Sequence, residues 1–298
     1  MGVVKNYLAP LLLSGLMAAQ APAPEPAKKA LFWTASSGNN VVYLLGSVHL
    51  GSKDMYPLPQ EIEAAFDRSS ALILEIDLDS LDVEQTRGLV RQLGYYPAGD
   101  NLWKHMSPKT REMLERFCAA NKLPLQQLVT MKPWMVQSSI AMVPLIKNGM
   151  VPDLGIDKYF AGKAKGKKRV VGIETAEEQF KVFAGFPDDV QERELADALK
   201  IADKAQENAK RTEDAWIAGD AEKLDKLLVE AASGPPEVQW AVRQGRNPRM
   251  ADAAEQFLKS KDVGFVVVGA AHLVGKDGVL RILEKRGYKV EQVELKKP

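Results

Sequence analysis

The sequence predicts an α/β protein with a mostly parallel sheet, helices on both faces and helical insertions that form a cap. Short continuous apolar runs bounded by glycine or polar residues are typical of buried strands. Amphipathic helical segments alternate with these runs, which favours a parallel sheet covered on both faces. Two helical stretches, residues 81–150 and 188–232, are too long for simple crossovers between strands. We expect these two insertions to form the cap.

The strand and helix signals follow one another in a regular order. Strands are expected at residues 41–45, 71–76, 169–173, 263–268 and 288–293. Helices are expected at residues 59–69, 156–165, 249–259 and 279–286, where apolar residues recur at helical spacing. The second insertion contains an interruption near Gly219. The first is expected to break into short segments at five prolines: Pro97, Pro108, Pro124, Pro133 and Pro144.

The beginning of the chain has the pattern of a signal peptide. Lys5 precedes an apolar run at residues 8–19, and Ala19-Gln20-Ala21 is a small-x-small cleavage pattern. We therefore expect a signal peptide at residues 1–21, a linker at 22–30 and one α/β domain at 31–298. An uncleaved membrane anchor is the alternative, but the apolar run is shorter than the ~20 residues that span a bilayer. The prediction is an exported protein, periplasmic or secreted, with no stable membrane anchor after cleavage.

Charge and cysteine content exclude several classes of function. The chain has 40 Lys and Arg against 39 Asp and Glu, so it lacks the basic excess of a nucleic-acid-binding protein. Cys118 is the one cysteine, which excludes an internal disulfide framework and a cysteine-based zinc site. Its place on an amphipathic helix predicts that it is packed in a core.

Two of the three histidines occur in the same motif. Gly46-Ser47-Val48-His49 and Gly269-Ala270-Ala271-His272 each follow a predicted buried strand. In open α/β sheets, ligands bind outside the carboxyl ends of the strands. Glycine lets the backbone turn sharply there and leaves room beside the imidazole. We expect both histidines to face one cleft.

Two glutamates occupy comparable positions. Glu75 follows the run at 71–74, with Asp77 two residues later, and Glu174 follows the run at 169–173. A glutamate at a buried strand end is costly unless it is paired, hydrogen-bonded or bound to a metal. Imidazoles and carboxylates together suit Mn²⁺, Fe²⁺, Co²⁺ or Zn²⁺. Such a metal lowers the pKa of bound water, and a remaining carboxylate can act as general base.

Simpler interpretations apply to each of these residues. A histidine after a strand is often only packed there. Glu75 can instead form a buried salt bridge with Arg246, and Glu174 can cap a helix at residues 175–183. His105, in a polar segment, is interpreted as a surface residue.

Several motifs together resemble the TraB/PrgY/GumN family, which includes the Tiki proteins, proposed metalloproteases that cut an amino-terminal segment from Wnt. The resemblance covers residues 31–293. Its pieces are LLGSVHLG at 44–51, LEIDL at 74–78, KPW at 132–134, GID at 155–157, GIETAEEQ at 172–179, GRNPRM at 245–250, VVGAAHLVGKDGVL at 267–280 and RGYKV at 286–290. It implies a fold similar to the haem-binding ChaN and erythromycin-esterase-like proteins, and dependence on a divalent metal, with Mn²⁺ or Co²⁺ reported for the animal members.

The resemblance also assigns roles to individual residues. His49 and His272 match the paired motif histidines that bind metal, and Glu75 matches the essential glutamate. Arg246 and Asn247 match the Arg-Asn pair before the last motif. Glu174 matches a recurring glutamate in this family, although Ile173 stands where leucine is usual. The chain also lacks the membrane anchor of the animal members, so their substrate does not carry over to it.

Three residues are candidates for binding substrate. A guanidinium such as Arg246 can bind a carboxylate or stabilise an oxyanion, with Asn247 beside it. An ion pair from Arg246 to Glu75 or Asp77 is an equally good interpretation. Trp134 can line a peptide groove, although a tryptophan after proline is more often a core anchor.

These observations favour an exported metal-dependent hydrolase, most simply a peptidase acting on a peptide or protein. His49, His272 and Glu75 or Glu174 would bind the metal, and the other glutamate would activate water. The alternative is a non-catalytic protein of the same fold that sequesters a peptide or cofactor; haem is disfavoured because no further axial residue accompanies the motifs. An esterase-like activity is a third hypothesis, without a Gly-x-Ser-x-Gly elbow.

Overall fold

A computed structural model describes residues 29–295 of the 298-residue chain, with residues 39 and 233 left out. The expected signal peptide and most of the expected linker lie outside the described residues. The linker was expected to continue to residue 30, but the first strand, β1 (Lys29–Ser37), begins one residue earlier, at Lys29. No helix within the described ranges is long and apolar enough to cross a bilayer.

A six-stranded mixed sheet forms the centre of the molecule, with the strand order β4-β3-β5-β2-β1-β6. The first four of these strands run parallel to one another. Only β1 runs in the opposite direction, because it pairs antiparallel with both β2 and β6. The expected α/β class with a mostly parallel sheet is therefore confirmed. The remaining strands are β2 (Asn40–Ser47), β3 (Ala71–Leu74), β4 (Arg169–Gly172), β5 (Gly264–Gly269) and β6 (Lys289–Glu294).

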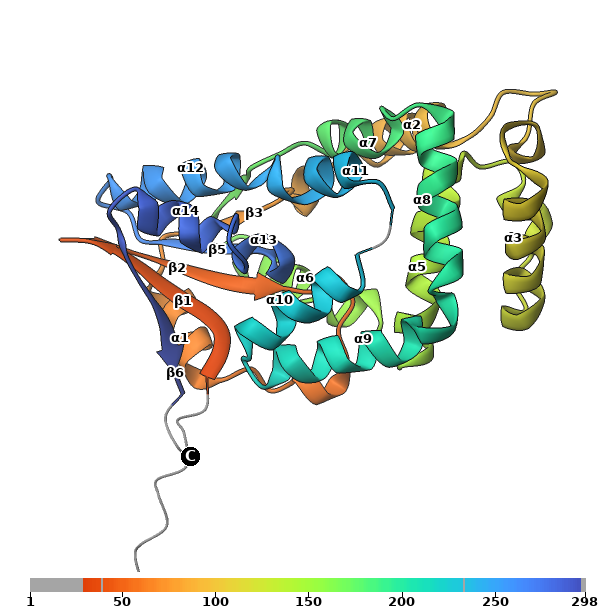
Figure 1. Cartoon of the computed structure of the whole chain (residues 1–298). Coiled ribbons are helices and arrows are strands. Elements are labelled where there is room, and N and C mark those ends of the chain that lie inside the picture. Colours follow the sequence, from red (N-terminus) through yellow and green to blue (C-terminus); the bar gives the residue numbers. More distant parts are fainter. Residues whose placement is uncertain (1–28, 39, 233, 296–298) are drawn as a thin grey trace, which may run out of the picture.

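Helices cover both faces of the sheet (Figure 1). On one face, the rings of Phe66 in α1 (Gln60–Arg68) and Phe160 in α6 (Ile156–Ala164) lie 5.5 Å and 4.9 Å from the ring of Phe265. On the other face are α12 (Asn247–Leu258) and α14 (Val279–Lys285). A side chain at Gly264 would meet Phe257 of α12, which shows how closely that helix packs on β5.

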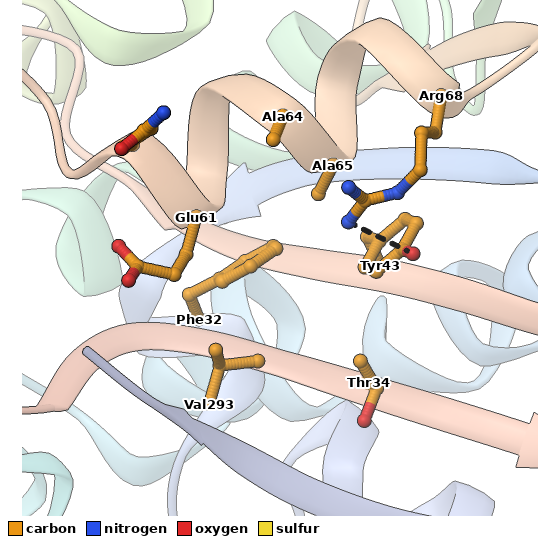
Figure 2. Close-up of a pocket in the computed structure, with 9 residues that line it drawn as sticks. Phe32, Thr34, Tyr43, Glu61, Ala64, Ala65, Arg68 and Val293 are labelled. Atoms are coloured by element: carbon orange, nitrogen blue, oxygen red, sulfur yellow. Dashed lines mark hydrogen bonds between the residues drawn. The ribbon is translucent and has the colours of Figure 1, made fainter. Parts of the chain in front are cut away.

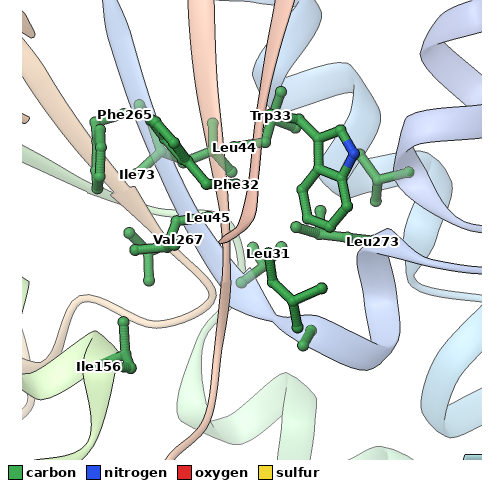
Figure 3. Close-up of a cluster of buried hydrophobic side chains, with 14 of the residues drawn as sticks. Leu31, Phe32, Trp33, Leu44, Leu45, Ile73, Ile156, Phe265, Val267 and Leu273 are labelled. Atoms are coloured by element: carbon green, nitrogen blue, oxygen red, sulfur yellow. The ribbon is translucent and has the colours of Figure 1, made fainter. Parts of the chain in front are cut away.

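The main hydrophobic core lies between the sheet and these helices. Figure 3 shows part of it around strands β1, β2 and β5, where Phe32, Leu45 and Val267 point into the interior. All three are nearly inaccessible to solvent. Burying a side chain of this size stabilises the fold by roughly 1.5–3 kcal/mol. This core holds the strands rigidly and so fixes the positions of the loops at their carboxyl ends.

The two helical insertions pack against each other around a second, smaller core. Leu114, Ile140 and Leu195 come from three different cap helices and are buried together with Cys118, as expected for that cysteine. Helices α5 and α8 lie side by side in Figure 1. The cap elements are α2 (Val83–Gly94), η3 (Leu102–His105), α3 (Pro108–Asn121), α4 (Leu125–Leu128), α5 (Pro133–Lys147), α8 (Asp188–Lys200) and α9 (Ala202–Ile217).

The second insertion does not belong wholly to the cap. Trp216, at the end of α9, and Leu224 of α10 (Ala221–Glu230) are buried in the main core. The indole Nε1 of Trp216 donates a hydrogen bond of 2.8 Å to the carbonyl oxygen of Gly46. This insertion therefore ties the cap to the strand end that carries the first histidine motif.

The remaining elements are short, and most connect these layers. They are η1 (Lys53–Met55), η2 (Leu78–Ser80), η4 (Pro152–Leu154), α7 (Ala176–Ala184), α11 (Pro236–Gln239), η5 (Trp240–Gln244) and α13 (Ala270–Leu273).

Two sequence-based expectations about secondary structure were wrong. Strand β1 was not expected, since its apolar part directly follows the assumed linker. Pro144 was expected to end a helical segment, yet it lies inside α5. A proline removes one helical hydrogen bond, but α5 also packs against α8 and α9. Pro108 and Pro133 do begin helices, where the missing N–H costs nothing.

Candidate functional site

The loops after four neighbouring parallel strands carry the motif residues. The pairing of β3 with β4 continues past the strand ends, because Ile173 N donates to Leu74 O at 2.9 Å and Glu174 N donates to Glu75 O at 2.8 Å. This backbone register places Glu75 and Glu174 side by side. Both side chains are buried, with 8% of each residue exposed. The expected convergence of strand ends is therefore found for the two glutamates.

Arg246 lies between the two glutamates and uses all five of its N–H groups inside the protein. Nη2 donates to Glu75 Oε2 and to Glu174 Oε2, both at 2.7 Å, and Nε donates to Glu174 at 3.0–3.1 Å. Nη1 donates to Val242 O at 3.1 Å and faces the Nε2 atom of His272 at 3.2 Å. A guanidinium has five N–H donors, so none is left for a substrate. Arg246 therefore forms the ion pair with Glu75 that was the alternative interpretation, and a second one with Glu174.

Glu75 has a partner on each of its carboxylate oxygens. Oε1 accepts from the backbone N–H of Gly269 at 2.7 Å, and Oε2 accepts from Arg246 and, at 3.1 Å, from Gln179 Nε2. A Cβ atom at position 269 would lie 3.1 Å from Oε1, so glycine there admits the carboxylate. Burial acts to raise the pKa of Glu75, but the positive charge that His272 carries when protonated, the Arg246 guanidinium and the Gly269 N–H together lower it below its usual value.

His272 is buried and neutral, and its tautomer follows from its neighbour Asn247. Asn247 Nδ2 donates to Asp277 O at 2.7 Å, so its Oδ1 must be the atom that lies 2.8 Å from His272 Nδ1. Because an amide oxygen only accepts, Nδ1 carries the proton and Nε2 presents a lone pair to Arg246. Burial lowers the pKa of His272 to about 4, with Arg246 acting in the same direction. Asn247 is 1% exposed, so it orients His272 and does not reach a substrate.

His49 lies in a different environment. Its side chain is 63% exposed, and Nδ1 lies 3.3 Å from Asp157 Oδ1. The hydrogen bond to Asp157 raises the pKa of His49 above its ordinary value against the opposing effect of partial desolvation, and the negative charge of Glu75 adds to the rise. The two histidines are therefore shifted in opposite directions: the pKa of His49 lies above its ordinary value, whereas that of His272 lies below it.

Backbone contacts between two loops bring Asp157 to His49. Gly51 and Val151 exchange hydrogen bonds of 3.1 and 2.8 Å, and Ile156 N donates to Val48 O at 3.0 Å. A Cβ atom at Gly155 would lie 2.4 Å from the carbonyl oxygen of His49, so only glycine permits this approach. Asp157 then lies in the first turn of α6. The Gly155-Ile156-Asp157 motif is visible in the sequence, but its pattern assigned no role to the aspartate.

A cavity of about 250 Å³ separates His49 from Glu75. Leu74, Ile76, Leu78 and Val267 form its apolar wall. The polar side chains that line it are Ser47, His49, Glu75, Asp157 and Gln179. The buried hydroxyl Ser47 Oγ has no hydrogen-bond partner in the part of the chain that the structure describes, and Asp157 Oδ1 has the contact with His49 Nδ1 alone. Buried polar atoms are usually paired, so Ser47 Oγ marks a place that a bound molecule can satisfy.

The structure places two other predicted residues away from this cavity. Trp134 is 4% exposed, stacks on Phe183 with ring centroids 6.1 Å apart, and donates from Nε1 to Leu93 O at 3.0 Å. Trp134 is therefore a core anchor, which was the alternative to lining a peptide groove. Glu174 does not cap the following helix, because Thr175 performs that role in a capping box with Glu178.

His105 was expected at the surface, and it lies there partly exposed, in contact with two carboxylates. Its side chain is 26% exposed and lies between Asp100 and Asp188, 2.9 Å from each. The imidazole also stacks on Tyr96, with ring centroids 4.4 Å apart. Asp188 is 83 residues further along the chain, so the local polar sequence gave no sign of this contact.

The predicted divalent metal does not fit the residues as they are arranged. No group of three or more His, Cys, Asp or Glu suited to a metal ion occurs among residues 29–38, 40–232 and 234–295. The space between Glu75, Glu174 and His272 is taken by the guanidinium of Arg246, 2.7–3.2 Å from all three. An ion with bonds of about 2.0–2.3 Å would overlap it. His49 pairs with Asp157 instead of joining His272.

A larger cavity of about 440 Å³ lies elsewhere, between α1 and strands β1, β2 and β6 (Figure 2). Phe32 and Tyr43 form its floor, and Arg68 lies over the ring of Tyr43 at 5.7 Å. None of the predicted site residues lines it. The smaller cavity at the strand ends therefore remains the candidate functional site.

The fold and this site define a class: α/β proteins with a helical cap and an ion-paired polar site at the carboxyl ends of parallel strands. The chain belongs to the TraB/PrgY/gumN family, whose sequence profile matches residues 31–292. This confirms the resemblance drawn from the motifs.

Similar proteins share only part of the sequence and carry no functional description. An uncharacterized protein of Treponema pallidum (strain Nichols) is 22% identical over 274 residues, which are 87% of this chain and 81% of that protein. The uncharacterized protein YbaP of Escherichia coli (strain K12) is 27% identical over 152 residues, which are 51% of this chain and 54% of YbaP. YbaP of Shigella flexneri matches to the same extent. No solved structure matches the chain.

Proposed function

We propose that this protein is a hydrolase that cleaves a peptide or related acyl bond in the cavity between His49 and Glu75. One observation carries the proposal: an accessible imidazole paired with a carboxylate faces a cavity at the carboxyl ends of parallel strands. Ligand sites of open α/β sheets occur at that edge. A histidine held by an aspartate is a recurrent general base.

In this proposal His49 activates a water molecule. With the Nδ1 proton directed to Asp157, Nε2 is left with the lone pair that takes a proton from water. The resulting hydroxide adds to the carbonyl carbon, and the imidazolium then returns the proton to the leaving amine or alcohol. Asp157 and the negative charge of Glu75 stabilise the imidazolium between the two steps. Asp157 acts as a positioning residue, since it reaches the reacting atoms only through His49.

The other residues of the cavity suit the remaining parts of the reaction. The buried hydroxyl of Ser47 has no partner among the described residues and can donate to the oxygen of a developing oxyanion. The wall formed by Leu74, Ile76, Leu78 and Val267 suits an apolar side chain of the substrate. A peptide or protein remains the proposed substrate class. No step in this reaction passes through a metal, because the residues do not fit one.

The test is a cleavage assay with the mature protein and a mixture of peptides of varied sequence, analysed by mass spectrometry. The wild-type protein is expected to cleave some of them, and His49→Gln should lower the rate about 10²–10⁴-fold, the usual contribution of a general base. His105→Gln is the matched control, because His105 also contacts carboxylates but lies in the cap, and it should retain activity. Undiminished cleavage by His49→Gln would contradict the proposal. Tight peptide binding without cleavage would instead favour the sequestering function.

We also propose that the protein acts outside the cytoplasm, in the periplasm or secreted, on the basis of residues 1–21. The amino-terminal sequence of the protein recovered from its native cells checks this directly. A mature chain that begins at Pro22 is expected, and recovery of the intact leader would contradict it.

A further inference from the structure

We propose that Arg246 is the permanent cation of the buried site, and that Glu75, Glu174 and His272 consequently hold no divalent metal in this protein. The inference concerns how the site is built, and it stands whether or not the cavity hydrolyses a substrate. It departs from the metal dependence that the family resemblance implies.

The charges and hydrogen-bond donors of the cluster are balanced with Arg246 as its cation. Arg246 supplies one positive charge between two buried carboxylates, and Gly269 N–H and Gln179 Nε2 supply further donors to them. His272 adds no charge: Asn247 Oδ1 accepts from Nδ1–H, and Nε2 faces Arg246 Nη1, which can only donate, so Nε2 carries the lone pair of a neutral imidazole. Its lone pair, which is the atom a metal would use, is directed at Arg246 Nη1. Each acceptor that a metal would need already has a donor.

Several elements hold the Arg246 guanidinium in this position. Arg246 follows the π-helical turn η5, where Val242 O accepts from Nη1 at 3.1 Å. π-Helical turns are rare and frequently occur at functional sites. Arg243, in the same turn, donates to Ala271 O at 2.8 Å and so ties η5 to the short helix that carries His272. The Arg246 side chain is 11% exposed, so it cannot move into water without opening this contact region.

Removing the guanidinium leaves three potential metal ligands without their donors, and they would have to move together to share an ion. Glu75 and Glu174 would be left without their counter-ion, and the lone pair of His272 Nε2 would be left without a donor. Two carboxylates and one imidazole are a common ligand set for Zn²⁺ and Mn²⁺. The inference therefore predicts that loss of one arginine converts a metal-free site into a metal site.

The experiment compares Mn²⁺ and Zn²⁺ binding to the full chain near neutral pH by titration calorimetry, after removal of adventitious metal with a chelator. Wild type is expected to give no saturable binding. Arg246→Ala should bind one equivalent about 100-fold more tightly than the weakest binding that the wild-type titration could detect, a difference of ~2.8 kcal/mol from that limit. Its thermal midpoint should rise on addition of either ion, because a ligand that binds only the folded state stabilises it.

Arg243→Ala is the matched control. Arg243 is a half-buried arginine of the same turn, but it pairs with the single carboxylate of Asp225 at 3.0 Å, so its loss should create no metal site. Wild-type protein that takes up one equivalent of metal, and loses that uptake in Glu75→Gln or His272→Gln, would overturn the inference. This wild-type measurement decides the question even if Arg246→Ala fails to fold without metal.

Discussion

The two Gly-x-x-His motifs have nearly the same sequence and lead to opposite environments. His49 lies on a loop after β2, exposed and beside Asp157, and its pKa is raised. His272 lies in α13 after β5, 7% exposed and beside Asn247 and Arg246, and its pKa is lowered to about 4. The strands themselves are hydrogen-bonded neighbours in the sheet.

The difference between the two motifs comes from the elements that pack against them. The loop before α6 brings a carboxylate to His49, whereas the start of α12 brings an amide and a guanidinium to His272. A strand-end motif therefore determines where an imidazole is placed, but not its protonation state. We conclude that one histidine is available for proton transfer and the other is part of a buried structural network.

The largest expected effect is a difference between the losses of stability caused by substitutions in the two regions. Arg246→Met should lower the free energy of unfolding by about 3–5 kcal/mol, because it leaves two buried carboxylates unpaired. Asp157→Asn, on the His49 side, should lower it by less than about 1 kcal/mol, as for most changes outside a buried network. Urea denaturation of both variants measures this. Equal losses of unfolding free energy in the two variants would contradict the distinction between a buried ionic network at His272 and an exposed pair at His49.

The next effect is a dependence of stability on pH. Unfolded His272 has an ordinary pKa of 6.5 and the folded residue one of about 4, so the unfolded chain binds the proton first as the pH falls. The free energy of unfolding should therefore fall by roughly 3 kcal/mol between these two pKa values on account of His272 alone. Carboxylates titrate in the same range, so the quantity to compare is the slope of wild type against that of His272→Gln. The variant should lose this part of the slope, and identical slopes would contradict the assignment.

The smallest effect concerns His49 and has the opposite sign. Its raised pKa means that it stabilises the folded state below pH 6.5, and that this contribution is lost as the pH rises through the folded-state pKa. Asp157→Asn should bring the pKa of His49 back down toward its ordinary value and leave His272 unchanged. A histidine titration by NMR measures both pKa values in one sample. If Asp157→Asn left the pKa of His49 unchanged, Asp157 would not be the residue that raises it.

The sequence predicted the parts of the fold that depend on local pattern. The apolar runs that became β2, β3 and β5 stand out because buried parallel strands need side chains that are apolar on both faces. The run that became β4 was expected to be buried as well, but β4 is an edge strand and its residues are at most partly buried. Strand β1 was missed because it begins within a segment whose composition suggested a linker. Pro144 was misjudged because packing of α5 against two other helices outweighs a local helix breaker.

The candidate site was predictable where its residues follow strands, and not where contacts join distant segments. Glu75, Glu174 and His272 come together because neighbouring parallel strands end at one edge of the sheet. The salt bridge from Glu75 to Arg246 was recognised as an alternative, but the sequence could not show that the same guanidinium also reaches Glu174 and His272. Asp157 was not recognised, because its approach to His49 depends on loop pairing across about one third of the chain.

The difference between the two motif histidines can be measured directly as the protonation state of the three histidines in the wild-type protein, followed by ¹⁵N NMR over a range of pH and assigned with His→Gln variants. We predict that His272 remains the neutral Nδ1–H tautomer down to a pKa of about 4, while the pKa of His49 lies above 6.5. Addition of Mn²⁺ or Zn²⁺ should leave the His272 signals unchanged. Two histidines that titrate alike, or that shift together when metal is added, would contradict this prediction.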